Sequence, residues 1–186
     1  IKGREQLPVS LQLKTPKNLV ASSSLQAKGG KYVASSFQKL TDAPILVAAA
    51  DTIHLQLANM DILISVYTPN QKIKASEVAK QLNPLLQAQL KYLGGKFPVT
   101  NYAFLIVMSA HLKNGSYGAL EHAQSSFYYL PEDSIQVMGP VIQDVSAHEF
   151  FHIQTPLNLH SKEIGSFDFQ IGLNCFLLCC TKSFTL

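Results

Sequence analysis

The chain has 186 residues, of which 47% are hydrophobic and 15% are charged, a composition typical of a globular protein rather than a disordered one. Its 15 Lys and Arg and 12 Asp and Glu residues are scattered, with no run of like charges that would suit nucleic acid or an anionic membrane. The longest apolar stretch near the end, around 175–180, is far shorter than the roughly 20 residues that cross a bilayer. We therefore expect a soluble protein with no nucleic-acid partner and no membrane span.

The three cysteines lie near the end of the chain, at Cys175, Cys179 and Cys180. They cannot form a disulfide framework across the body of the domain. The sequence starts at Ile1 without the pattern of a signal peptide, so we expect a leader that was removed or was never present. The compartment stays open between periplasm, secretion and cytoplasm, and the oligomeric state stays open too.

The first part of the chain carries strand patterns. Over residues 1–40, short apolar pairs alternate with Gly, Ser and Pro, which indicates strands and turns. Over residues 52–67, polar and apolar side chains are interleaved. This second pattern fits one or two half-buried strands.

A helical period follows over residues 74–93, where Val and Leu recur three or four positions apart. We expect Ser76 to be the N-cap of this helix, and Gly94 and Gly95 to end it. Pro84 is expected to kink the helix or divide it in two.

Two strands and another helix are predicted in the rest of the mixed segment. Residues 102–108 are a continuous apolar run, typical of a strand buried on both faces, and residues 125–130 form a second strand. A helix is expected from about Val141 through His152, ended by Pro156. A β-rich piece thus precedes a mixed segment, and we expect an α+β fold whose last helix holds two histidines.

That last helix contains the motif His148-Glu149-Phe150-Phe151-His152. Residues four apart lie on one face of a helix, so His148 and His152 can share one metal ion. Zinc held in this way keeps an open position for water, and the neighbouring Glu149 can accept a proton from that water. The alternative is an amphipathic helix whose histidines are ordinary core or surface residues.

Three segments resemble the glycyl aminopeptidase family, which are thermolysin-like zinc peptidases with a C-terminal PDZ domain. Residues 147–164, with the later Phe167-Asp168-Phe169, look like the family's zinc helix and the loop after it. Residues 117–122, Tyr-Gly-Ala-Leu-Glu-His, resemble the Gly-Gly-Leu-Glu-His segment upstream of that helix, and residues 36–45 resemble the link between the family's first two domains. The resemblance spans most of residues 1–170.

The resemblance implies a domain organisation. Residues 1–38 would be the end of an N-terminal β-sandwich-like domain, and residues 39–170 the N-terminal part of a thermolysin-like (gluzincin) catalytic domain. Residues 171–186 would be an atypical tail that bears no likeness to the family.

The resemblance also implies roles for residues of the upstream segment. Gly118, Ala119, Glu121 and His122 would bind substrate, with the strand backbone pairing with a peptide and Glu121 attracting its free α-amino group. The alternative is that Gly118 only makes a turn and that Glu121 and His122 form a solvated pair.

The chain departs from the family pattern at the third zinc ligand, which in the family is a glutamate on a later helix. Residues 169–186 contain no Asp, Glu or His. His160 lies eight residues beyond His152, which does not match the six of the all-histidine motif. The remaining donors are Glu163, Asp168 and the three cysteines, of which Cys175 and Cys179 have helical spacing. We therefore expect a truncated site and an inactive chain.

The function expected for the parent protein is hydrolysis of peptide bonds by a zinc aminopeptidase that favours small N-terminal residues such as Gly or Ala. Its cofactor would be Zn²⁺ bound by His148 and His152, with Glu149 as general base and a peptide as partner. The second hypothesis is an inactive fragment or pseudoenzyme that binds zinc or peptide weakly. A third is a structural or binding module whose histidines only pack.

Overall fold

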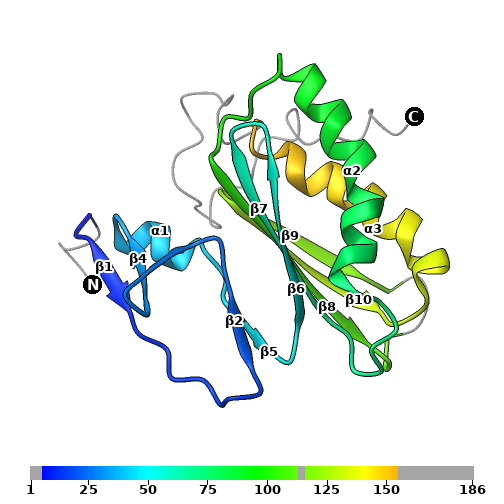
Figure 1. Cartoon of the computed structure of the whole chain (residues 1–186), viewed down its shortest axis with the longest axis horizontal. Helices are drawn as coiled ribbons and strands as arrows, with labels where there is room; N and C mark the ends of the chain where they lie inside the picture. The colour runs from blue at the N-terminus through cyan, green and yellow to red at the C-terminus, as the bar shows by residue number, and fades with distance from the viewer. Residues whose placement is uncertain (1–5, 113–115, 155–186) are drawn as a thin grey trace, which may run out of the picture.

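The structure, a computed structural model, describes residues 6–112 and 116–154 (Figure 1). Its N-terminal part contains two small sheets and a short helix, α1 (Phe37–Thr41). The first sheet has the order β1-β4-β3 with antiparallel pairing, and the second pairs β2 with β5, also antiparallel. The bounds of these strands are β1 Val9–Leu11, β2 Val20–Ser22, β3 Gln26–Lys28, β4 Lys31–Ala34 and β5 Leu46–Ala48.

A five-stranded sheet forms the larger part and has the order β6-β7-β8-β10-β9. Its three inner strands run parallel, while the two edge strands, β6 and β9, are antiparallel to their neighbours. The bounds are β6 Asp51–Leu57, β7 Met60–Tyr67, β8 Asn101–Ser109, β9 Gly118–His122 and β10 Ser125–Pro131. The predicted strands over 52–67, 102–108 and 125–130 are therefore confirmed.

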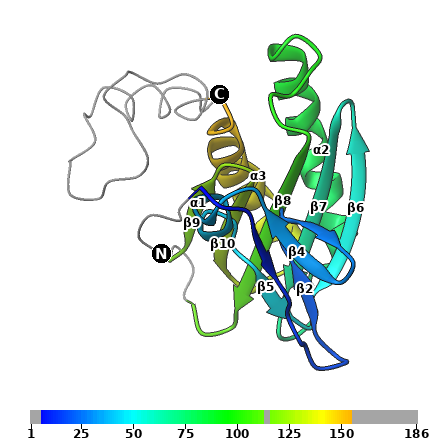
Figure 2. The same cartoon turned by 90° about the vertical axis from the view of Figure 1, so that its left-hand side faces the viewer.

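Two long helices, α2 (Ala75–Tyr92) and α3 (Ile135–Phe151), cover one face of this sheet (Figure 1). α2 contacts β6 and β7, α3 contacts β9 and β10, and the helices contact each other. The N-terminal strands lie on the opposite side of the sheet, in front of it in Figure 2. The result is a mixed α and β architecture in which α3 and β9 face each other near one edge.

The core lies between the sheet and the two helices. Register places Ile64, Phe104 and Ser126 on neighbouring strands in one row, and Glu121 of β9 completes that row. Because side chains alternate along a strand, residues two apart share this helix-facing side. The Phe150 ring of α3 packs against it, with its centroid 5.8 Å from that of Phe104.

The start of α2 differs from the sequence-based expectation. Lys74, not Ser76, is the N-cap. The Ala75 N–H donates to Oδ2 of Asp51 on β6 at 2.8 Å, and the Lys74 N–H donates to Oε2 of Glu77 at 2.9 Å. A carboxylate from another element therefore satisfies the first N–H of this helix, which begins before Ser76.

The rest of α2 agrees with its pattern in part. The helix continues through Pro84 as one element, so of the two effects expected of this proline, a kink or a division, the division is wrong. Gly94 and Gly95 follow its end with φ of +77° and +85°, and the Gly95 N–H donates to the Leu90 carbonyl at 2.8 Å. Glycine adopts these positive φ values without the strain that a side chain would add.

α3 begins at Ile135, six residues before the expected start, with Ser134 as N-cap. Gly139 and Pro140 therefore lie inside the helix. Packing accounts for this, because Gly139 is buried against α2, where an added Cβ would lie 3.0 Å from the Gln81 side chain. The helix ends at Phe151 with His152 as its C-cap. The expected stop at Pro156 lies outside the described residues.

No helix within residues 6–112 and 116–154 is both long and apolar enough to span a membrane.

Candidate metal and catalytic site

The two histidines of the motif come together at the C-terminal end of α3. The Nε2 atoms of His148 and His152 lie 3.3 Å apart. The ring centroids are 5.0 Å apart with the planes nearly perpendicular. Helical i,i+4 spacing produces this approach, so the sequence expectation that they share one face is met by the geometry.

Glu149 lies beside them and is 7% exposed. Burial, and secondarily the charge of Glu121, raises its pKa from 4.5 to about 7. Its Oε2 atom has no hydrogen-bond partner among the described residues. A carboxylate with a pKa near neutrality can accept a proton at neutral pH and release it again.

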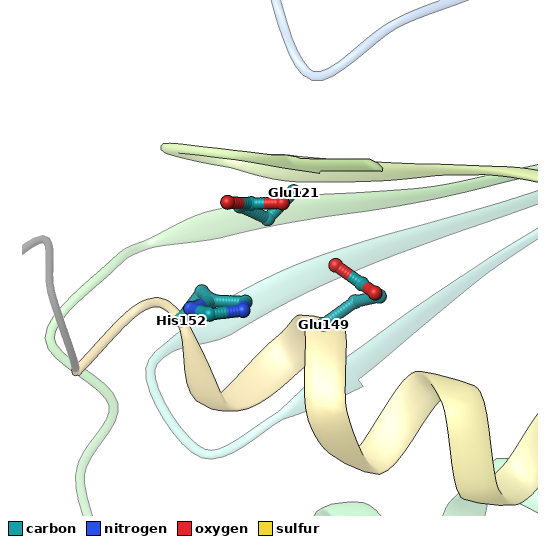
Figure 3. A group of neighbouring side chains, drawn as sticks. All are labelled: Glu121, Glu149 and His152. Atoms are coloured by element: carbon teal, nitrogen blue, oxygen red, sulfur yellow. The ribbon is translucent and has the colours of Figure 1, made fainter. Parts of the chain in front are cut away.

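Glu121 reaches the same place from β9. It lies on the helix-facing side of that strand, opposite Ser126 of β10. Ligand atoms of Glu121, Glu149 and His152 all lie within 4.8 Å of one another, and Figure 3 shows the three side chains converging in the space between β9 and α3. Residues 121 and 149–152 are thus joined by the packing of an edge strand on a helix.

The donor set fits a divalent transition metal. In tetrahedral zinc sites with bonds of about 2.0–2.1 Å, two ligand atoms lie roughly 3.4 Å apart, which is close to the 3.3 Å between the His148 and His152 Nε2 atoms. Imidazole nitrogen and carboxylate oxygen are ordinary zinc ligands. His148 and His152 could therefore hold zinc with little movement, and a carboxylate of the cluster is near enough to join them or to act on a bound water.

His122 is the predicted site residue that the fold places elsewhere. It follows Glu121 in the strand and therefore points to the other face of the sheet. There its Nδ1 lies 3.2 Å from Oδ1 of Asp42, at the end of α1, and the Ala123 N–H donates to Oδ2 of Asp42 at 3.1 Å. Glu121 and His122 thus do not form the solvated pair considered as an alternative.

Gly118 and Ala119 occupy the start of the edge strand. Gly118 is exposed, and an added Cβ would meet nothing within 4 Å. It lies in β9 rather than in a turn. Ala119 is half-buried and packs against the core. No strand among the described residues pairs with the outer edge of β9, and such an edge can accept an added peptide strand.

Sequence reasoning missed two features around this site. One is the link from Asp42 to His122, which joins residues 80 positions apart and leaves no local signal. The other is a set of buried hydroxyl groups near Glu149, on Tyr102, Ser126, Tyr128 and Ser146. Polar residues at alternate positions of the otherwise apolar β10 were the available signal for the second.

The other candidate ligands, His160, Glu163, Asp168 and the three cysteines, lie outside the described residues.

A search of solved structures finds a similar fold in the crystal structure of an aminopeptidase N family protein from Idiomarina loihiensis. The TM-score is 0.69 at 16% sequence identity, and the match covers 89% of this chain and 31% of that one. This chain therefore spans about a third of the length of that protein. A scan against family models finds no match, and neither does a search of curated proteins. The expectation of an aminopeptidase-like fold is confirmed.

Proposed function

We propose that this chain carries part of the active site of a zinc metallopeptidase, an aminopeptidase that removes small N-terminal residues such as Gly or Ala. The observation that carries the proposal is the convergence of two imidazoles 3.3 Å apart with two carboxylates from separate elements. The fold shared with an aminopeptidase N family protein is consistent with it. The narrower resemblance to glycyl aminopeptidases rests on the motifs at 117–122 and 147–164.

In this proposal His148 and His152 are the metal ligands. Zinc, when bound, supplies an open position at which the pKa of water falls toward neutrality. Glu149 would accept a proton from the attacking water on a carboxylate oxygen and would later deliver a proton to the leaving amine. Its raised pKa, about 7, suits both steps because a general base works best when its pKa lies near the ambient pH.

Glu121 and the edge of β9 position the peptide. An extended substrate would add to the open edge of β9 through backbone hydrogen bonds, which aligns its scissile carbonyl along the strand. The Glu121 carboxylate would form an ion pair with the free α-amino group and so define the end of the substrate. Gly118 and Ala119 are small, which leaves space for the peptide backbone near the start of the strand. His122 would then act indirectly, by holding β9 against Asp42.

The domain organisation forms part of the same proposal. Residues 39–170 are taken as the N-terminal part of a thermolysin-like catalytic domain, and residues 1–38 as the end of a preceding β domain. β2 pairs with β5 across this boundary at Val20–Ser22 and Leu46–Ala48, so the two units share a short sheet.

The test is hydrolysis of glycyl and alanyl amides by the zinc-loaded chain and its Glu149→Gln variant. Proton transfer by a positioned side chain contributes about 10²–10⁴-fold, so the variant should lose at least about a hundredfold in kcat while keeping its zinc. Glu121→Gln should chiefly raise KM, and only for substrates with a free amino group. Measurable hydrolysis at equal rates in Glu149→Gln and in the parent would refute the proposed base.

A second candidate is binding of metal or peptide without hydrolysis. One observation favours it: within the described ranges the cluster offers two imidazoles and two carboxylates, which is a full set of four metal ligands. The peptidase mechanism would instead use both carboxylates for purposes other than metal ligation. Zinc bound tightly by a parent chain that hydrolyses none of these amides would favour this candidate.

A further inference from the structure

Four hydroxyl groups are buried between the sheet and α3, in the neighbourhood of Glu149. They belong to Tyr102 of β8, Ser126 and Tyr128 of β10, and Ser146 of α3, and none of the four residues is more than 1% exposed. Sheets covered by helices normally bury apolar side chains at such positions. A buried hydroxyl costs free energy unless it is hydrogen-bonded, so each of these groups requires a partner.

The four hydroxyl groups lie close to the Glu149 carboxylate. Ser146 precedes Glu149 by three residues, which places both on one face of α3. The Tyr102 ring lies edge-on to Phe150, with centroids 4.8 Å apart. Burial chiefly raises the pKa of Tyr102, and the charge of Glu149 adds to that shift.

The sheet side of the cluster is equally close. Ser126 lies opposite Glu121 in the β9–β10 register. Burial also raises the pKa of Tyr128, while the neighbouring hydroxyls of Ser126 and Ser146 oppose the shift. Strand and helix therefore bring their hydroxyl groups together, near enough for Tyr102 and Tyr128 to feel the charge of Glu149.

Hydrogen bonding within this cluster is incomplete. Tyr128 Oη and Ser126 Oγ are paired at 2.6 Å. Tyr102 Oη, Ser146 Oγ and Glu149 Oε2 have no partner in hydrogen-bond geometry among the described residues, although the Ser126 hydroxyl lies near Tyr102 and the Ser146 hydroxyl lies near Tyr128. Two of these three atoms can donate and the third can accept. A single water molecule makes two to four hydrogen bonds and joins such groups in protein interiors.

We propose that a buried water molecule binds between the Tyr102 hydroxyl, the Ser146 hydroxyl and Glu149 Oε2, and that it fixes the orientation of the Glu149 carboxylate. Tyr102 and Ser146 are then positioning residues, since they act on Glu149 through the water. The water site itself stands independently of zinc. Its effect on catalysis rests on the role proposed above for Glu149, whose other oxygen would be left free to accept a proton.

The sign of a stability change tests the water site in the metal-free chain. If water joins the three atoms, Tyr102→Phe and Ser146→Ala each deprive it of a partner. Each should then raise the ratio of unfolded to folded chain about fivefold or more, which corresponds to a loss of about 1 kcal/mol. If no water is present, each variant removes an unpaired buried hydroxyl, and stability should stay equal or rise.

A double-mutant cycle sharpens this test. If both residues bind the same water, the double variant Tyr102→Phe/Ser146→Ala should lose less stability than the sum of the losses in the two single variants. Ser65→Ala is the matched control, because Ser65 is fully buried with an unpaired Oγ on the sheet face away from α3. Destabilisation by both single variants with a less-than-additive double variant supports the proposal. Neutral or stabilising and additive effects overturn it.

Two further measurements keep the proposal testable if a variant does not fold. A crystal structure of the parent chain at high resolution should show density within hydrogen-bonding distance of all three atoms, and its absence would overturn the proposal. The infrared carboxyl band that disappears in Glu149→Gln should shift in Tyr102→Phe at the same pH. A purely structural role for Tyr102 would leave that band in place. Neither result depends on zinc binding or hydrolysis, so the proposed function can fail separately.

Discussion

The helix-facing side of the five-stranded sheet has two halves that differ in chemistry although they share one architecture. Where α2 covers β6 and β7, the buried side chains are apolar, including Ile62, Ile64, Val78, Leu82 and Leu86. Where α3 covers β9 and β10, buried polar side chains are interspersed with the apolar ones: Ser126, Tyr128, Ser146, Glu149 and His152.

This difference shows how one core can serve two purposes. Apolar burial contributes roughly 25 cal/mol per Å² to stability, so the α2 half holds the layers together. Buried carboxylate and hydroxyl groups lower stability unless they are paired. We infer that the α2 half stabilises the fold while the α3 half places reactive groups at a cost, as is usual for functional sites.

The largest effect is expected in the α2 half. Leu82 is fully buried between α2 and the sheet, so Leu82→Ala should lower the free energy of unfolding by about 2–5 kcal/mol through lost burial and a new cavity. Urea denaturation measures this. Lys80→Ala, at an exposed position of the same helix, should change stability by less than about 0.5 kcal/mol. A loss below about 1 kcal/mol for Leu82→Ala would contradict the inference that the α2 half of the core stabilises the fold.

An intermediate effect, dependent on pH, is expected in the α3 half. The pKa of Glu149 is about 7 in the folded chain against its ordinary 4.5. Below pH 4.5 the carboxyl is protonated in both states. As pH rises from 4.5 to 7 the unfolded state loses this proton first, so stability falls, and it levels off above pH 7. The total loss should be on the order of 3 kcal/mol.

Glu149→Gln isolates this contribution because all other titrating groups are common to both chains. The variant cannot ionise at position 149, so its stability relative to the metal-free parent should increase between pH 4.5 and 7 and stay constant above that range. Urea denaturation at several pH values measures the difference. A difference that is flat from pH 4 to 8 would show that Glu149 is not buried as described.

The smallest effect concerns the other face of the sheet. Asp42 accepts from the Ala123 N–H and contacts His122 Nδ1, so Asp42→Ala should cost about 1 kcal/mol through lost hydrogen bonds. Asp61→Ala, which removes an exposed acidic side chain, is the control. Hydrogen exchange should also quicken in β9 of the Asp42 variant. Unchanged exchange in β9 would mean that Asp42 does not hold this strand.

Elements with a strong local signal could be predicted from sequence. The apolar spacing of α2, the continuous apolar run of β8 and the glycines after α2 each agree with the structure, because local period and backbone preference determine them. The approach of His148 to His152 also follows from helix geometry alone.

Features that depend on distant residues could not be predicted in this way. Asp51 of strand β6 caps the start of helix α2. α3 starts well before Pro140, and Gly139 is buried against α2. Gly and Pro usually mark a boundary, so the local sequence indicated a later start. The meeting of Glu121 with α3 depends on strand register and helix packing, which no local pattern encodes. Family resemblance indicated Glu121, but only the fold shows its distance from Glu149.

The metal site proposed on α3 is tested most directly by zinc binding to the purified chain, measured by elemental analysis after dialysis and by titration calorimetry. We expect about one zinc per chain, lost in His148→Ala and in His152→Ala and retained in His54→Ala, which alters an exposed histidine on β6. Absence of zinc from the parent chain, or equal zinc content in all three variants, would contradict the claim that α3 carries a metal site.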